Sequence, residues 1–273
     1  MGWLRERFFR LGAAYLTKPL APYPQRAALD PETLRQTLRP GDIILVEGDQ
    51  RVSEVIKFLT QSSWSHAALY VGDAFSAPND EDRPTMEARH GTDASHLLVE
   101  ALLEGGVTMS PLAKYAGYNI RICRPIGLHA DDLQRILDET MGQLGTRYDV
   151  RHVMELARYF FPVNLIPRRF RRTALEAAST LTHDVICSSL IALAFQNVGF
   201  PILPSLVKSE TPPAPRVREG LPQHRPPYPG MFRHKRTNLI TPRDFDLSPY
   251  FEIVKIKLKV SDPFDYRRIH WQE

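Results

Sequence analysis

The fold of this chain is constrained most strongly by residues 182–199, which read THDVICSSLIALAFQNVG. From Cys187 onward the apolar residues recur with the spacing of one helix face, at positions 190, 191, 194, 195 and 198. Gly199 then supplies a typical helix stop. The sequence therefore predicts a helix from about Cys187 to Val198, with Cys187 in its first turn.

A cysteine in the first turn of a helix is chemically favoured as a nucleophile. The unpaired backbone N–H groups and the positive end of the helix dipole stabilise a thiolate over a thiol. The same N–H groups are suited to hold the oxyanion of an acyl-transfer intermediate. A thiolate also needs a base, and the best candidate is His66, in the stretch WSHAALYVGD at residues 64–73.

The composition indicates a globular protein with a mildly basic surface. Of the 273 residues, 43% are hydrophobic and 24% are charged, and the formal net charge is +4. Such a chain is long enough to bury a full core. Clustered arginines suit an anionic membrane surface or nucleic acid. Because the sequence has no zinc-finger, helix-turn-helix or aromatic RNA-binding signature, we do not expect a nucleic-acid partner.

The cysteine content and the N-terminus point to the cytoplasm. The two cysteines, Cys123 and Cys187, are too few for a disulfide framework. Residues 1–10 lack the continuous apolar core of a signal peptide, and no run approaches the roughly 20 apolar residues of a membrane span. We therefore expect a cytoplasmic protein, either free or peripheral at the inner face of a membrane.

Two basic and aromatic segments, residues 1–18 and 159–172, leave two interpretations open. Both segments mix large apolar side chains with arginines, as an interfacial helix at a membrane does. The simpler interpretation is that each segment packs its apolar side on the rest of the protein. The pattern alone does not separate these two structures.

Apolar runs bounded by turn residues predict the strands of a sheet. These runs are residues 43–46, 66–71, 97–101, 107–109, 118–124 and 251–260. Lysines on the open face of the last run, at positions 255, 257 and 259, are typical of an edge strand. Residues 131–144 place apolar side chains on one face of a further helix, which Gly145 ends.

Changes in composition divide the chain into regions. An N-terminal amphipathic extension covers residues 1–30, and a core domain covers residues 31–200 with a helical insertion at 151–180. Residues 201–250 are rich in proline, which favours an irregular wrap or a semi-rigid linker. Residues 251–273 are expected to form a C-terminal edge strand and tail.

Three polar residues occur in an order that suits thiol catalysis. His66 opens one predicted strand, Glu100 ends a later one, and Cys187 opens the helix. An imidazole holds a thiolate as an ion pair and later protonates the leaving group, and a third polar group fixes the imidazole tautomer. If the two strands pair and the helix packs across them, the three side chains converge.

A metal site is the weaker interpretation of the same region. His183 and Cys187 are four residues apart and could bind zinc from one helix turn. His183 precedes the predicted helix start, however, and no second ligand pair occurs at a suitable spacing. We therefore expect neither a metal nor a cofactor. Cys123, within a predicted strand, is expected to be a packing residue.

Five motifs follow one another along the chain in a distinctive order. They are PGDIILV at 40–46, WSHAALYV at 64–71, LVEA at 98–101, GTRYD at 145–149 and CSSLI at 187–191. Together they resemble the permuted papain-like cysteine hydrolases, and more closely the YiiX/YebB-like branch of the NlpC-type superfamily. That branch is related to lecithin:retinol acyltransferase, and in it the histidine strand precedes the cysteine helix, the reverse of papain.

The resemblance implies an α+β fold with a circularly permuted papain-like core, in which the nucleophile helix packs on an antiparallel sheet. It implies Cys187 as the nucleophile, His66 as the base and Glu100 as the orienting residue. The backbone N–H of Cys187 would supply part of the oxyanion hole, and Tyr148 would help to shape the site. The helical insertion and the proline-rich segment lie outside this common core.

The activity implied by the resemblance is hydrolysis of an amide or acyl bond through a Cys187 thioester. The expected substrate is a small-molecule, peptide or lipid acyl compound, with peripheral membrane contact through residues 1–18 and 159–172 as an open question. One alternative is an acyltransferase of the lecithin:retinol type, in which another acceptor resolves the thioester. A second alternative is a non-catalytic, membrane-associated binding module, which would have no need to keep the cysteine, histidine and glutamate together.

Overall fold

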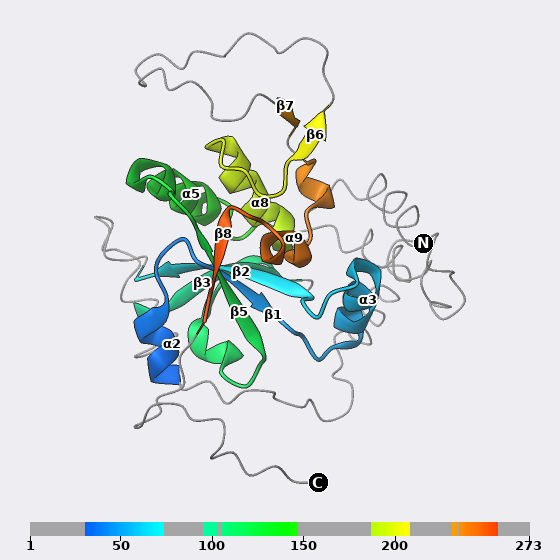
Figure 1. Ribbon diagram of the computed structural model, residues 1–273. Helices are drawn as coiled ribbons and strands as arrows, with labels where there is room; N and C mark the ends of the chain where they lie inside the picture. The colour runs from blue at the N-terminus through cyan, green and yellow to red at the C-terminus, as the bar shows by residue number, and fades with distance from the viewer. Residues whose placement is uncertain are drawn as a thin grey trace, which may run out of the picture.

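The computed structural model describes residues 31–73, 95–102, 105–146, 187–207, 231–233 and 235–255 (Figure 1). The predicted N-terminal extension and the predicted insertion at 151–180 lie outside these residues, as do Tyr148 and His183. The basic and aromatic segments at 1–18 and 159–172 also lie outside them. Within the described part of the chain, no helix combines the length and the apolar character that a membrane crossing requires.

A six-stranded antiparallel sheet forms the centre of the fold, in the order β4-β3-β2-β1-β5-β8. Its strands are β1 (Ile43–Val46), β2 (His66–Gly72), β3 (Leu97–Leu102), β4 (Gly106–Pro111), β5 (Ile120–Pro125) and β8 (Phe251–Val254). All of β1 is buried, because β1 lies between β2 and β5 and is covered on both faces. The predicted α+β class with an antiparallel sheet is confirmed.

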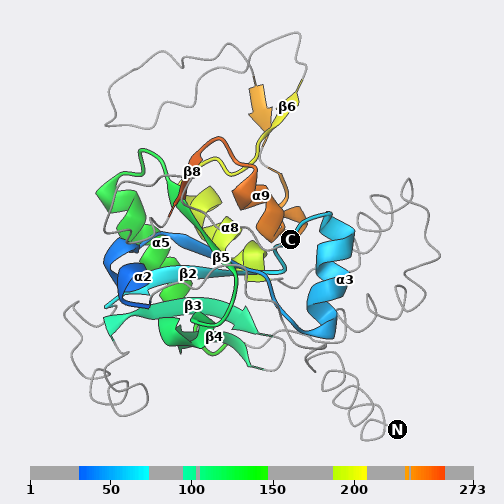
Figure 2. The same cartoon turned by 60° about the horizontal axis from the view of Figure 1, so that its bottom comes forward.

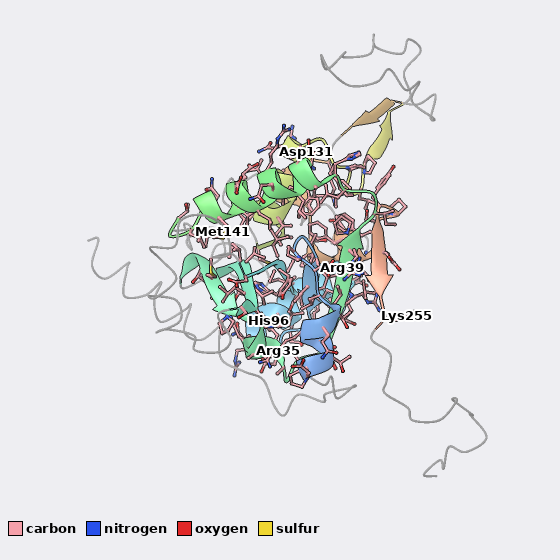
Figure 3. All side chains as sticks on the ribbon, turned by 90° about the vertical axis from the view of Figure 1, so that its left-hand side faces the viewer. Arg35, Arg39, His96, Asp131, Met141 and Lys255 are labelled. Atoms are coloured by element: carbon pink, nitrogen blue, oxygen red, sulfur yellow. The ribbon has the colours of Figure 1, made fainter. Side chains whose placement is uncertain are left out.

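Helices cover both faces of this sheet. On one face, α8 (Cys187–Asn197) and α5 (Ala130–Gly142) contribute to the larger core cluster. On the other face, α2 (Pro31–Thr37) and the short 3-10 helix η2 (Leu112–Tyr115) complete a second cluster. Figure 3 shows α5, labelled at Asp131 and Met141, and α2, labelled at Arg35, on opposite sides of the sheet. The helix α3 (Arg51–Thr60) connects β1 to β2 and lies beyond one end of the sheet (Figure 2).

Buried side chains hold α8 against β2 and β3. Ile191 and Phe195, one helical turn apart, are both fully buried in the core. The hydroxyl of Ser188 donates to the carbonyl oxygen of Ile240 at 2.6 Å and so anchors the first turn. Gly199 follows the helix with a φ of +81°, a left-handed conformation that glycine adopts readily at helix ends. The helix lies where its apolar spacing predicts it.

The pairing of β2 with β3 places two of the predicted site residues on one face of the sheet. Tyr70 pairs with Leu98 in the antiparallel register. Continuing this register sets Glu100 opposite Ala68, two residues from His66 along β2. Side chains in this diagonal relation project from the same face and can meet when they are long.

The proline-rich region at 201–250 contains more regular structure than its composition indicates. The strands β6 (Ser205–Val207) and β7 (Met231–Arg233) pair with each other, and the helices η5 (Thr237–Leu239) and α9 (Pro242–Asp246) follow. The start of α9 is a capping box formed by Thr241 and Asp244, with Pro242 in the first turn. Proline at this position starts a helix, because its missing N–H has no intrahelical partner there in any case.

Candidate active site

His66 opens β2 and reaches across to Glu100 on β3. The distance from Nε2 of His66 to Oε2 of Glu100 is 2.6 Å, and the His66 side chain is only 19% exposed. His66 also forms a hydrogen bond with Cys187. The imidazole therefore links the other two predicted residues, and the structure brings all three side chains together.

The carboxylate of Glu100 is completely buried and accepts hydrogen bonds from three side chains. Besides His66, Nζ of Lys114 donates to Oε1 at 2.5 Å, and the hydroxyl of Tyr115 donates to Oε2. Burial by itself disfavours the charged form of a carboxyl group. His66 and Lys114 outweigh this effect and hold the pKa of Glu100 well below its ordinary value. Glu100 is therefore ionised at neutral pH.

Cys187 lies in the first turn of α8 and is only 7% exposed. Burial disfavours its thiolate, as it does any buried charge. The charge and hydrogen bond of His66, together with the backbone N–H groups of Ala67 and Ser188, nevertheless lower the pKa of the Cys187 thiol below its usual value. The sulfur is thus surrounded by donors that favour its anionic form.

The same interactions act on His66 in the opposite direction. Burial by itself would lower the pKa of His66, but Cys187 and Glu100 outweigh it and raise the pKa to about 10. The lowered pKa of the thiol and the raised pKa of the imidazole both favour a thiolate–imidazolium pair over the neutral pair. This ion pair is the form in which a cysteine attacks a carbonyl carbon.

A cleft of about 550 Å³ opens at the end of the sheet where β1 ends and where β2 and β5 begin. The turn that leads into His66 forms part of its wall, through residues 61–64. The other described residues that line the cleft are Glu47, Asn119, Ile120, Arg121, Arg243, Asp246 and Leu247. The cleft therefore lies at the same end of the sheet as His66, although Cys187, His66 and Glu100 are not among the residues that line it.

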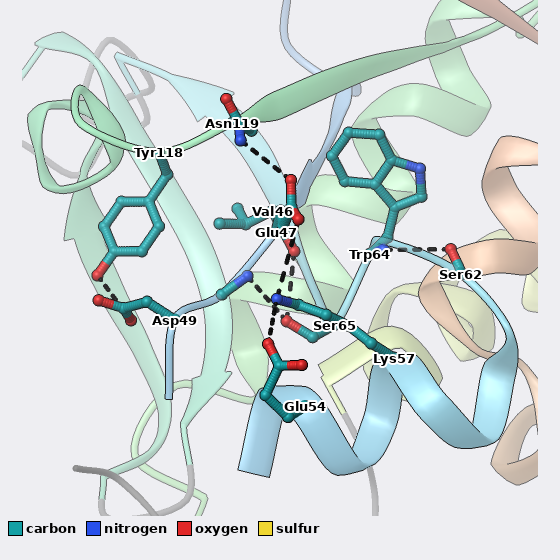
Figure 4. Close-up of polar contacts among 11 residues, drawn as sticks. Val46, Glu47, Asp49, Glu54, Lys57, Ser62, Trp64, Ser65, Tyr118 and Asn119 are labelled. Atoms are coloured by element: carbon teal, nitrogen blue, oxygen red, sulfur yellow. Dashed lines mark hydrogen bonds and ion pairs between the residues drawn. The ribbon is translucent and has the colours of Figure 1, made fainter. Parts of the chain in front are cut away.

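Several polar and charged groups of this cleft have fixed partners. The guanidinium of Arg121 donates to Asp246 and lies 4.9 Å from the centre of the Trp64 ring. The indole N–H of Trp64 donates to the other carboxylate oxygen of Asp246 at 3.1 Å. Asn119 donates to Glu47 at 3.0 Å, as Figure 4 shows. The walls are therefore polar, and the charges of Arg121 and Asp246 compensate each other.

The model of the family described as "Permuted papain-like amidase enzyme, YaeF/YiiX, C92 family" matches residues 37–186, more than half of the chain. The chain belongs to this family. A comparison with curated proteins finds no match. The region of this C92 amidase that matches contains His66 and Glu100 and ends directly before Cys187. The protein is therefore an enzyme, an amidase- or peptidase-like hydrolase with a permuted papain-like fold.

Two polar residues of the site in this amidase were not predicted from the sequence. Lys114 and Tyr115 both contact Glu100, yet they belong to a short 3-10 helix without a recognisable motif. Their one signal is their place directly after β4, which pairs with the strand of Glu100. Tyr148, the predicted site-shaping residue, lies outside the described residues. Among the described residues, no group of three His, Cys, Asp or Glu side chains is arranged to hold a metal ion.

Proposed function

We propose that this protein cleaves amide bonds through a covalent thioester on Cys187, with His66 as general base and acid and Glu100 as the residue that orients the imidazole. The observation that carries the proposal is the position of His66, which contacts Glu100 through Nε2 and also hydrogen bonds to Cys187. A family of amidases supplies the reaction class. The contacts of His66 with Glu100 and Cys187 support the roles proposed for the three side chains.

In the proposed first step, the Cys187 thiolate attacks the carbonyl carbon of the substrate and a carbon–sulfur bond forms. The carbonyl oxygen becomes an oxyanion, which the backbone N–H of Cys187 at the start of α8 is suited to stabilise. The carbon–nitrogen bond then breaks, and the His66 imidazolium gives its proton to the departing amine.

In the second step, water resolves the thioester. Neutral His66 takes a proton from the water molecule as its oxygen attacks the carbonyl carbon. The carbon–sulfur bond breaks, the carboxylic acid leaves, and the thiolate–imidazolium pair is restored. Glu100 keeps the imidazole in one orientation throughout, because its carboxylate accepts from Nε2.

We infer that the cleft receives the substrate, because it opens beside the turn that leads into His66. Its walls then favour a polar substrate over a long acyl chain. Its described lining includes four charged side chains, Glu47, Arg121, Arg243 and Asp246. A hydrocarbon chain placed there would desolvate these groups without replacing their hydrogen bonds with water. We therefore propose a peptide or another small polar amide as the substrate rather than a lipid ester.

The catalytic part of the proposal is tested by covalent labelling. Cys187→Ala should abolish labelling by a thiol-directed acyl probe, whereas Cys123→Ala should leave it intact, because Cys123 is fully buried in the sheet and its thiol has a raised pKa of about 12. Labelling that survives in Cys187→Ala would exclude Cys187 as the nucleophile.

The substrate part is tested by comparing hydrolysis of a library of short peptide amides with that of lipid esters. Arg243→Met removes a charged lining residue and should raise KM for the amides that are cleaved. Arg236→Met is the matched control, because Arg236 is exposed and is not among the described lining residues. Preferential cleavage of lipid esters would contradict the assignment of a polar substrate.

A further inference from the structure

The carboxylate of Glu100 has more donors than the orientation of one imidazole requires. His66 and Tyr115 share Oε2, whereas Lys114 contacts Oε1. The Lys114 ammonium and the Glu100 carboxylate form an ion pair at 2.5 Å in which Glu100 is completely buried and Lys114 is 35% exposed. Both oxygens of the carboxylate are therefore fixed, and the group cannot turn away from His66 without breaking two further hydrogen bonds.

Packing places Lys114 and Tyr115 at this position. Both residues belong to η2, which directly follows β4, and β4 pairs with β3 so that Thr108 lies opposite Glu100. Leu112 of the same helix is buried in the second core cluster, as is Tyr115. The Tyr115 ring is centred 6.1 Å from the ring of His66. Tyr115 therefore contacts both members of the His66–Glu100 pair.

We propose that Lys114 and Tyr115 are positioning residues of the reaction, which keep Glu100 ionised and directed at His66 while His66 gains and loses its proton. This inference rests on the proposed function of Cys187 and His66. Neither residue is placed in contact with the substrate.

The chemical need for Lys114 arises in the middle of the reaction. When His66 has given its proton to the leaving amine, it is neutral and no longer compensates the charge of Glu100. A buried carboxylate beside a neutral imidazole would tend to bind a proton itself, because burial disfavours its charge. Lys114 remains a cation at that moment, so Glu100 stays an acceptor and the proton on Nε2 stays with the imidazole.

The ionisable groups that face Glu100 come from two elements. His66 lies on β2, and Lys114 and Tyr115 lie on η2. Cys187 of α8 acts on Glu100 through its hydrogen bond with His66. Lys114 is thus the cation beside Glu100 whose charge does not change during the reaction, among the groups that the structure describes at this carboxylate.

The sign of the expected pH effect follows from these contacts. Lys114 is one of the groups that lower the pKa of Glu100, so its removal raises that pKa. As the pH falls, Glu100 then binds a proton at a higher pH and no longer accepts from Nε2 of His66. The imidazolium is then no longer held beside Cys187, and the thiolate binds a proton more readily. The pH at which acidification has halved the reactivity of Cys187, here called the acid-side midpoint, must therefore rise.

The experiment measures the rate of Cys187 alkylation by iodoacetamide between pH 3 and pH 10, with mass spectrometry of the peptide that carries Cys187. In Lys114→Met the acid-side midpoint should rise by about one pH unit, the lower end of the effect of a neighbouring opposite charge. Lys114→Arg should restore the wild-type midpoint. Tyr115→Phe should shift it in the same direction by less, since it removes a neutral donor.

Two matched variants separate this role from a general structural one. Lys235→Met removes a lysine whose side chain is similarly exposed, at 32%. Nζ of Lys235 lies 2.8 Å from Oδ2 of Asp244 and does not contact Glu100. Tyr118→Phe removes a hydroxyl that donates to Asp49 rather than to Glu100. Neither control should move the acid-side midpoint.

An unchanged profile in both Lys114→Met and Tyr115→Phe would overturn the inference, as would an equal shift in Lys235→Met. If Lys114→Met does not fold, Tyr115→Phe and Lys114→Arg still decide the question. A wild-type Cys187 that is inert at every pH would overturn the proposed function as well. If wild-type Cys187 is reactive but its pH profile is unchanged in the Lys114 and Tyr115 variants, only the positioning role of these two residues is overturned.

Discussion

Glu100 and His66 are separated by 34 positions in the chain, yet Oε2 of Glu100 lies 2.6 Å from Nε2 of His66 in the folded protein. The pairing of β2 with β3 produces this contact, because it sets the two side chains on the same face of the sheet. The contact in turn raises the pKa of His66 and stabilises the thiolate of Cys187. A backbone register therefore determines the reactivity of a thiol on a different element.

The pH dependence of thiol reactivity should reveal the ion pair. We expect wild-type Cys187 to react with iodoacetamide well below the pKa of about 8.5 that an ordinary thiol shows. In His66→Ala the burial of Cys187 is no longer opposed by an imidazolium, and the rate at pH 6 should fall by at least about 100-fold. Equal rates for the two proteins at pH 6 would show that the imidazole does not activate the thiol.

Turnover should decline at alkaline pH because His66 loses its proton there. Its pKa is raised to about 10, so the imidazolium that protonates the leaving amine persists below that pH and is lost above it. We expect kcat/KM for an amide substrate to fall as the pH rises, with a midpoint near 10. A decline centred near 6.5, the ordinary value for histidine, would contradict the pairing of His66 with Cys187 and Glu100.

Glu100→Gln should reduce activity far more than any loss of folding stability can explain. The amide nitrogen of glutamine cannot accept the hydrogen bonds that Glu100 receives, and a donor would face a donor at His66 or at Lys114. We expect kcat to fall by about 10⁴-fold, as in the serine triad whose orienting carboxylate is replaced by an amide.

The control for this variant is Glu139→Gln. Glu139 is a half-buried residue that accepts a hydrogen bond from Asn197 on α8, so the substitution alters a contact of the same helix away from the site. Its kcat should remain within about twofold of wild type, because surface substitutions are close to neutral in stability. A similar loss in both variants would point to displacement of α8 rather than to the carboxylate of Glu100.

Arg124→Met should destabilise the protein strongly. Arg124 donates through two nitrogens to Asp42, which is 1% exposed and would be left as an unpaired buried charge. Loss of one partner of a buried pair costs about 3–5 kcal/mol. Arg135→Met breaks an exposed pair with Asp132 and should cost less than about 1 kcal/mol. Urea unfolding measures both values, and similar costs would contradict this view of the Asp42 pair.

The α8 helix offers a second matched pair of substitutions. Ile191 is fully buried in the core, whereas Leu193 on the same helix is 40% exposed. Ile191→Ala should reduce the free energy of unfolding by about 2–5 kcal/mol, because it leaves a cavity. Leu193→Ala should cost well under half as much in the same urea titration. Equal losses would mean that α8 is not packed on the sheet through its Ile191 side.

Much of the fold follows from local patterns in the sequence. The continuous apolar run of β1 is predicted because every one of its residues is buried. The apolar spacing after Cys187 gives α8, and the order of His66, Glu100 and Cys187 identifies three residues that the structure brings together. These features are predictable because periodicity and residue type alone determine them.

Other features depend on contacts that no local pattern encodes. Lys114 and Tyr115 reach Glu100 only because β4 folds back on β3 and turns into η2. Arg121 and Asp246 meet across the cleft although 125 positions separate them. The helix α9 begins with a capping box at Thr241, and the high proline content of the region gave no indication of this helix. Composition describes a region on average and does not identify such pairings.

The strand order also sets an order of assembly during folding. The strands β1 to β4 pair as neighbours in sequence, so their contacts close shorter stretches of chain than the one that joins α8 to them. Loop-closure entropy grows with loop length, and local contacts tend to form first. We therefore expect the contact between His66 and Glu100 to form before Cys187 packs beside them. A newly made chain would then carry an ordinary thiol, and its reactivity would begin only when α8 docks.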